Sequence, residues 1–123
     1  MLEKLIGAQI LTVNEDSIEV KLGENIFKLE IESDGGDCCG YASFTTNLLY
    51  SENDFRNPII TNVSLDNEEN SYEGDSSVIT FYGESKALAT IESEAGSGSG
   101  WNYGAFVTLR CKALDIDENL ASW

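Results

Sequence analysis

Hydrophobic and polar residues alternate along most of this chain, which is the pattern of β-strands that bury one face. The clearest example is residues 17–22, where Ile18, Val20 and Leu22 share one face. Short segments rich in Asn, Asp, Glu and Gly separate such runs and predict tight turns. The strands predicted in this way are residues 8–13, 17–22, 26–31, 59–65, 78–82, 87–91 and 103–112.

The remaining segments have weaker patterns. Residues 41–46 fit either a strand or the start of a helix, and residues 48–56 fit one helical turn. Residues 66–77 are polar and acidic, which predicts a loop, and residues 114–123 predict a short tail with one helical turn. The whole pattern predicts one all-β domain over residues 1–123. It would hold about seven or eight short antiparallel strands and little helix, arranged as a sandwich or as a curled, partly closed sheet.

The net charge of the chain limits the functions that such a domain can have. The 123 residues include 22 Asp and Glu but only 7 Lys and Arg, which gives a net charge of −15. Such a chain has no broad basic face for direct binding of nucleic acid, and it is unsuited to anionic membranes. There is no histidine, which excludes histidine-based acid–base catalysis and histidine metal ligands. We therefore expect a binding protein and not an enzyme.

The start of the chain and its cysteines indicate a compartment. The first residues lack a basic stretch followed by an apolar one, so no signal peptide is recognisable. No apolar run approaches the roughly 18–20 residues that span a bilayer. An odd number of cysteines, two of them adjacent, fits a reducing environment better than a disulfide framework. These features predict a cytoplasmic protein.

The cysteines are also candidate metal ligands. Cys38 and Cys39 follow Asp37 in a segment flanked by glycines, and Cys111 lies near the end of the last long predicted strand. Thiolates with a carboxylate suit a structural Zn²⁺ site, and glycines permit the bend that turns neighbouring cysteines to the same side. The spacing lacks paired C-x-x-C motifs. The alternative is that these cysteines are small buried side chains without metal.

A glycine-rich segment at residues 96–100 allows a second kind of site. Its backbone N–H groups could hold a phosphate, and the side chains of Trp101, Tyr103, Tyr82 and Lys86 could line a small-ligand pocket. The segment lacks the Lys-Ser/Thr pair of a P-loop, and nearby glutamates would repel phosphate. The simpler interpretation is a loop between strands.

The distribution of acids supports a third interpretation. From Lys28 to Arg56, and again from Arg56 to Lys86, acids occur without any intervening base. Such runs are usually solvated surface, but a stable domain does not need so large a charge. Carboxylates spaced along a sheet could imitate the charges of DNA and occupy an Arg- and Lys-lined channel. The candidate partner-binding acids are Asp66, Glu68, Glu69, Glu73 and Asp75.

Four short motifs, in this order and spacing, resemble those of a family of small, mostly uncharacterised proteins from phages and mobile elements. The motifs are Leu5-Ile6-Gly7, Gly36-Asp37-Cys38-Cys39, Phe81-Tyr82-Gly83 and Gly100-Trp101-Asn102-Tyr103-Gly104. The resemblance implies a phage origin and a mostly β fold. By analogy with other small acidic phage proteins, it also implies an inhibitor of host defence such as an anti-CRISPR protein.

Taken together, these features predict a stoichiometric inhibitor. It would bind the basic nucleic-acid-handling surface of a bacterial defence protein, with a type II CRISPR effector nuclease as the leading target, and would block DNA loading or recognition. The alternatives are a binding protein for a small nucleotide signal and a minor structural protein of a phage.

Overall fold

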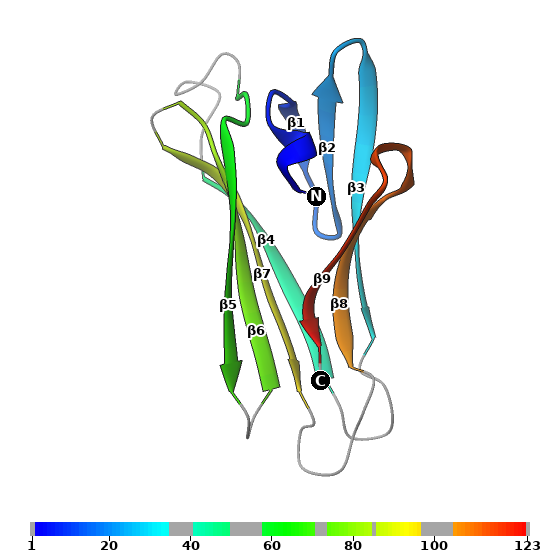
Figure 1. The fold of residues 1–123 in the computed structure, drawn as a ribbon, viewed down its shortest axis with the longest axis vertical. Helices are drawn as coiled ribbons and strands as arrows, with labels where there is room; N and C mark the ends of the chain where they lie inside the picture. Colours follow the sequence, from blue (N-terminus) through cyan, green and yellow to red (C-terminus); the bar gives the residue numbers. More distant parts are fainter. Residues whose placement is uncertain are drawn as a thin grey trace.

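The computed structural model describes residues 2–34, 41–49, 58–70, 74–84, 86–96 and 105–122. It is a sandwich of two antiparallel sheets that face each other and do not close into a barrel (Figure 1). We name the sheet of five strands sheet A and the sheet of four strands sheet B. The described residues contain no helix long and apolar enough to cross a membrane.

Sheet A has the strand order β1-β2-β3-β8-β9, and sheet B has the order β4-β7-β6-β5. A 3₁₀ helix, η1 (Leu2–Leu5), precedes the first strand, and a second, η2 (Lys112–Leu114), connects the last two. The strands of sheet A are β1 (Gln9–Val13), β2 (Ser17–Leu22), β3 (Asn25–Asp34), β8 (Phe106–Cys111) and β9 (Ile116–Ser122). Those of sheet B are β4 (Tyr41–Leu48), β5 (Asn62–Asn70), β6 (Gly74–Tyr82) and β7 (Ala87–Gly96).

The core lies between the two sheets because alternate residues of each strand point inward. Sheet B contributes Ile79, Phe81 and Ile91, all fully buried, and sheet A contributes residues such as Leu29 and Leu109. The edge strand β9 packs across β6 and β7 of the opposite sheet. This burial of aliphatic and aromatic side chains is the main source of stability in such a sandwich.

The chain passes between the sheets twice at the same end of the sandwich. It leaves sheet A after Asp34 and enters sheet B at Tyr41, and it leaves sheet B after Gly96 and returns by Phe106. The register explains the common location, because Asp34 pairs with Phe106 and Tyr41 pairs with Gly96. The far end of sheet B, by contrast, carries Tyr82, paired with Ala87.

The prediction of an all-β antiparallel sandwich is confirmed, and nine strands are found among the described residues. The segment 41–46, which fitted either a strand or a helix, belongs to strand β4. The strand predicted at 59–65 begins later, at Asn62, and residue 59 forms only an isolated bridge to Gln9. Most of the helical turn considered for residues 48–56 lies outside the described residues, and Leu48 ends a strand.

The prediction of a loop at residues 66–77 is wrong. Residues 66–70 and 74–77 are strand residues of the β5–β6 hairpin, whose paired positions run from Asn62 with Tyr82 to Asn70 with Gly74, while residues 71–73 lie outside the described residues. Asp, Asn and Glu are rare in strands, but a sheet with one solvated face accommodates them there. The inward positions Val63 and Ile79 supply apolar contacts for the hairpin, because Ile79 is fully buried and Val63 packs against the core.

The prediction of a short tail with one helical turn at residues 114–123 is also wrong, because residues 116–122 form strand β9. The sequence hides this strand because Leu120 and Ala121 are adjacent and both buried, which breaks the alternation. An irregularity in the pairing with β8, between Val107 and Thr108, accommodates the extra residue. The one helical turn in this region is η2, which comes before the strand.

The adjacent aromatic residues Phe81 and Tyr82 provide a test of which face of sheet B is buried. Phe81 is fully buried, whereas Tyr82 remains 37% exposed. We expect Phe81→Ala to lower the free energy of unfolding by about 3–5 kcal/mol, because it removes the largest fully buried side chain and leaves a cavity. Tyr82→Ala is the control and should cost much less. Urea denaturation measures both, and equal losses would contradict the assigned faces.

Candidate functional site

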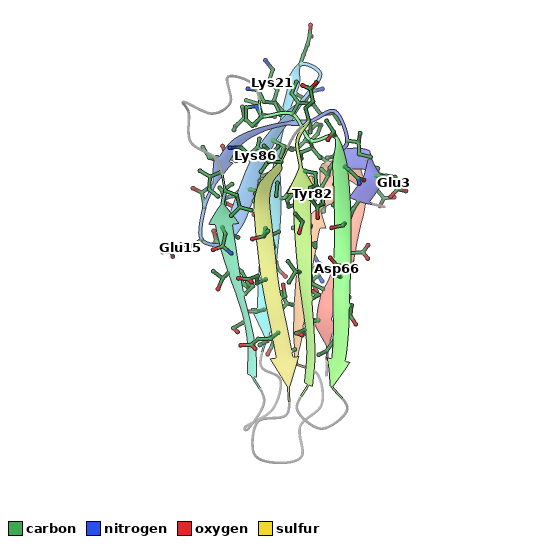
Figure 2. The ribbon with its side chains drawn as sticks, turned by 90° about the vertical axis from the view of Figure 1, so that its left-hand side faces the viewer. Glu3, Glu15, Lys21, Asp66, Tyr82 and Lys86 are labelled. Atoms are coloured by element: carbon green, nitrogen blue, oxygen red, sulfur yellow. The ribbon has the colours of Figure 1, made fainter. Side chains whose placement is uncertain are left out.

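The outer face of sheet B is the most distinctive surface of the molecule. Figure 2 shows this sheet toward the viewer, with Asp66 midway along β5 and Lys86 at one end of the sheet. No lysine or arginine occurs in any of its four strands, which contain six acids. The strands of sheet A also contain six acids, but they contain three bases, Lys21, Lys28 and Arg110. The negative charge of sheet B therefore has no cation within its own strands.

The register aligns the acids in two rows across sheet B. In the first row Asp66 of β5 pairs with Val78 of β6, which pairs with Glu92 of β7. In the second row the corresponding positions are Glu68, Ser76 and Glu94. Because antiparallel strands rise roughly 3.4 Å per residue, Glu92 and Glu94 are roughly 6.8 Å apart along β7. This is about twice the 3.4 Å axial spacing of phosphates along one DNA strand.

Neutral side chains hold these carboxylates in place. Ser43 Oγ donates a hydrogen bond of 3.1 Å to Glu94 Oε1. Asn47 Nδ2 donates to Glu92 Oε2 at 3.2 Å and to Thr90 Oγ1 at 3.1 Å. A hydroxyl or an amide orients a carboxylate without cancelling its charge, so the face is both ordered and negative.

The same face is hollowed. An open depression of about 440 Å³ runs over it, lined about equally by polar and apolar surface, with hydroxyls between the acids. Its lining residues come from all four strands and are Ser43, Phe44, Thr45, Asp66, Ser76, Ser77, Val78, Glu92, Ser93 and Glu94. Such a surface suits the protruding cationic side chains of a partner better than an apolar ligand.

Sheet A differs from sheet B because its outer face carries bases as well as acids. On its outer face Arg110 Nη1 lies 3.0 Å from Glu32 Oε2, and Arg110 Nε lies 3.5 Å from Asp117 Oδ1. Lys28 pairs across the strands with Glu19. Acids on this side are thus interleaved with bases, and the local charge is partly compensated.

The structure places only some of the predicted partner-binding acids. Asp66 is exposed on the outer face, and Asp75 is partly buried and accepts a hydrogen bond of 3.0 Å from Asn67 Nδ2. The backbones of Glu68 and Glu69 belong to β5, while Glu73 lies outside the described residues. Sequence reasoning missed Glu92 and Glu94. Their alternation with Ser93 could have identified them as acids on one face of a strand.

The proposed zinc ligands lie mostly outside the described residues, which include Cys111 but not Asp37, Cys38 or Cys39. Cys111 is buried on β8, at the end that pairs with Ile116. The segment with the other three leaves sheet A beside Phe106, roughly 16 Å away along β8 at about 3.3 Å per residue. Within the described part of the chain no group of three potential ligands is close enough to hold a metal ion. The zinc site stays a prediction.

The structure describes two of the four residues predicted to line a pocket with the glycine-rich segment, Tyr82 and Lys86. Tyr82 and Lys86 lie at the start of β7, whereas residues 97–104 begin after Gly96 at the other end of this strand. At about 3.3 Å per residue the two ends are roughly 30 Å apart, so Tyr82 lies far from Gly96, where the glycine-rich segment begins. Trp101 and Tyr103 themselves lie outside the described residues.

Comparisons with protein families, with curated proteins and with solved structures find no match to this chain. The resemblance to proteins of phages and mobile elements therefore stays a prediction. Function has to be argued from the charge and geometry of the surface.

The location of Cys111 can be tested by its effect on metal content. We expect Cys111→Ser to leave the zinc content of the purified protein unchanged, because Cys111 lies at the opposite end of β8 from Phe106, which pairs with Asp34, the last described residue before the Asp37-Cys38-Cys39 segment. Elemental analysis measures this, with Cys38→Ser as the matched variant in that segment. Zinc that is present in the unmodified protein and lost in Cys111→Ser would contradict this placement.

Proposed function

We propose that this protein is a non-catalytic inhibitor that docks the outer face of sheet B on a basic, nucleic-acid-handling surface of another protein. The observation that carries the proposal is the absence of any lysine or arginine from the four strands of this sheet, together with four acids at outward positions, Asp66, Glu68, Glu92 and Glu94. Complementary charge steers association and suppresses wrong partners. A basic surface that normally holds DNA or a guide–target duplex is the natural complement of such a face.

The arrangement of the acids supports competition with nucleic acid over a general solubility role. The carboxylates of Glu92 and Glu94 follow one strand at a regular spacing and are oriented by Asn47 and Ser43. Solubility requires net charge but no such order, and the interleaved charges of sheet A would serve it equally well. A type II CRISPR effector nuclease is the specific target that we propose, on the basis of the family resemblance.

A non-enzymatic role is consistent with the composition of the chain. Without histidine, proton transfer near neutral pH would require a carboxylate, thiol or amine with a strongly shifted pKa. Docking by charge requires only the carboxylates that the strands display. Direct binding of nucleic acid is not expected for a face of this sign.

The double variant Glu92→Gln, Glu94→Gln tests the proposal. Its matched control is Glu24→Gln, Glu30→Gln, which removes the same charge from the β2–β3 turn and from the outer face of sheet A. We expect the sheet B variant to weaken binding to the captured partner by roughly two- to thirtyfold at low salt, since each of the two exposed ion pairs contributes about 0.2–1 kcal/mol. The control should bind nearly as well as the unmodified protein.

The measurement starts with capture of the partner from a bacterial lysate at low salt. The partner's affinity is then determined over a series of salt concentrations, with and without duplex DNA. We expect affinity to fall as salt rises, because salt screens charges over about 8–10 Å, and we expect DNA to compete. An affinity independent of salt, or equal effects of the two double variants, would refute the proposal. A co-purifying nucleotide would instead support the small-ligand alternative.

A further inference from the structure

Strand β5 is a free edge of sheet B. Within the part of the chain that the structure describes, β6 is its only paired neighbour, and η1 packs near its start, where Gly7 N–H donates to the carbonyl of Ile60 at 2.7 Å. Natural sheets usually protect such edges with lysine, proline, a bulge or a very short strand. β5 spans nine residues, Asn62–Asn70, and contains neither lysine nor proline.

The direction of the edge hydrogen-bonding groups follows from one contact. The N–H of Val63 donates to Asn62 Oδ1 at 2.9 Å, which indicates that it points away from the paired residue Phe81. In an antiparallel pair, successive residues point their N–H and C=O groups alternately toward and away from the neighbouring strand. The N–H groups of Leu65 and Asn67 therefore point to the free edge, one on each side of the outward-facing position of Asp66.

A second copy of this chain is a poor occupant of the edge. Full-length antiparallel pairing of two β5 strands would align the two Asp66 residues directly and set each Ser64 opposite a Glu68. Directly opposed like charges destabilise a strand pair, and Asp66 would occupy a pair without mutual hydrogen bonds, where side chains approach most closely. The acids of β5 thus select against self-association, and they favour a strand with cations at the same positions.

We propose that the β5 edge receives an extended segment of the partner protein, with Lys or Arg at alternate positions, as an additional antiparallel strand of sheet B. Main-chain hydrogen bonds to Leu65 and Asn67 would supply affinity, and a cation opposite Asp66 would supply specificity. The added strand would continue the outer face, so its alternate cations would lie beside the row formed by Asp66 and Glu92. This inference rests on the proposed function and specifies how the basic partner docks.

The test uses two short peptides of the same composition. One alternates lysine with threonine, and the other carries its lysines in one block followed by its threonines. Both have the same charge, but only the first presents all its lysines on one face when extended. We expect the alternating peptide to bind and to slow amide hydrogen exchange at Leu65 and Asn67, while the block peptide does not. Equal binding of the two peptides, or unchanged exchange at both amides, would overturn the proposal.

A pair of variants separates backbone pairing from charge. Leu65→Pro and Leu65→Ala both remove the leucine side chain, but only proline removes the N–H that points to the edge. We expect Leu65→Pro to bind the alternating peptide about two- to tenfold more weakly than Leu65→Ala, which is the effect of one lost hydrogen bond. Equal affinities would overturn the proposal. Should Leu65→Pro fail to fold, the exchange measurement on the unmodified protein decides.

The same variants distinguish failure of this inference from failure of the proposed function. If Glu92→Gln, Glu94→Gln weakens binding to the captured partner while Leu65→Pro and Leu65→Ala bind it equally, docking by charge stands and strand addition is wrong. If neither variant weakens that binding, both proposals fall.

Discussion

The burial of one face of each sheet against the other is the interaction on which the rest of this molecule depends. Side chains such as Ile79, Phe81 and Ile91 lose all contact with solvent between the sheets. Because strand residues alternate between two faces, fixing the inner positions also fixes which residues point outward. A slip of one residue in β7 would move Glu92 and Glu94 into the core, where unpaired charges are very costly. Packing of the core thus holds the acidic face in register.

The same alternation of inward and outward positions explains how the sandwich remains stable with a large negative charge. Each sheet contributes six acids from its strands, but the bases are confined to sheet A. Repulsion among like charges destabilises a compact state, yet it is weaker when the charges remain hydrated on an open sheet. Hydrogen bonds from Ser43 and Asn47 order the carboxylates without neutralising them. The result is a negative surface with oriented carboxylates beside the edge strand β5.

The candidate site was only partly predictable from the sequence, because its acids come from strands that are far apart in the chain. Asp66 and Glu92 share a row of sheet B although they are far apart in the sequence. The whole of strand β6 comes between them in the chain. Composition identified the acids of residues 66–75 but described them as a loop, because Asp, Asn and Glu favour turns when considered locally. Pairing with β6 overrides that preference, since the ladder satisfies the backbone and the outer face keeps the charges hydrated. The same pairing separates Tyr82 and Lys86 from the glycine-rich segment.

The sequence alone determined the all-β class, the strands from β1 to β3, the net charge of −15 and the lack of histidine chemistry. These are local or additive properties: alternation, turn residues and the count of ionisable groups. Tertiary structure decided which strands became neighbours, that residues 116–122 form β9, and that the bases lie in the strands of one sheet only. Such outcomes depend on pairing between segments far apart in the chain. That pairing depends on how the two sheets pack, which no local window of sequence contains.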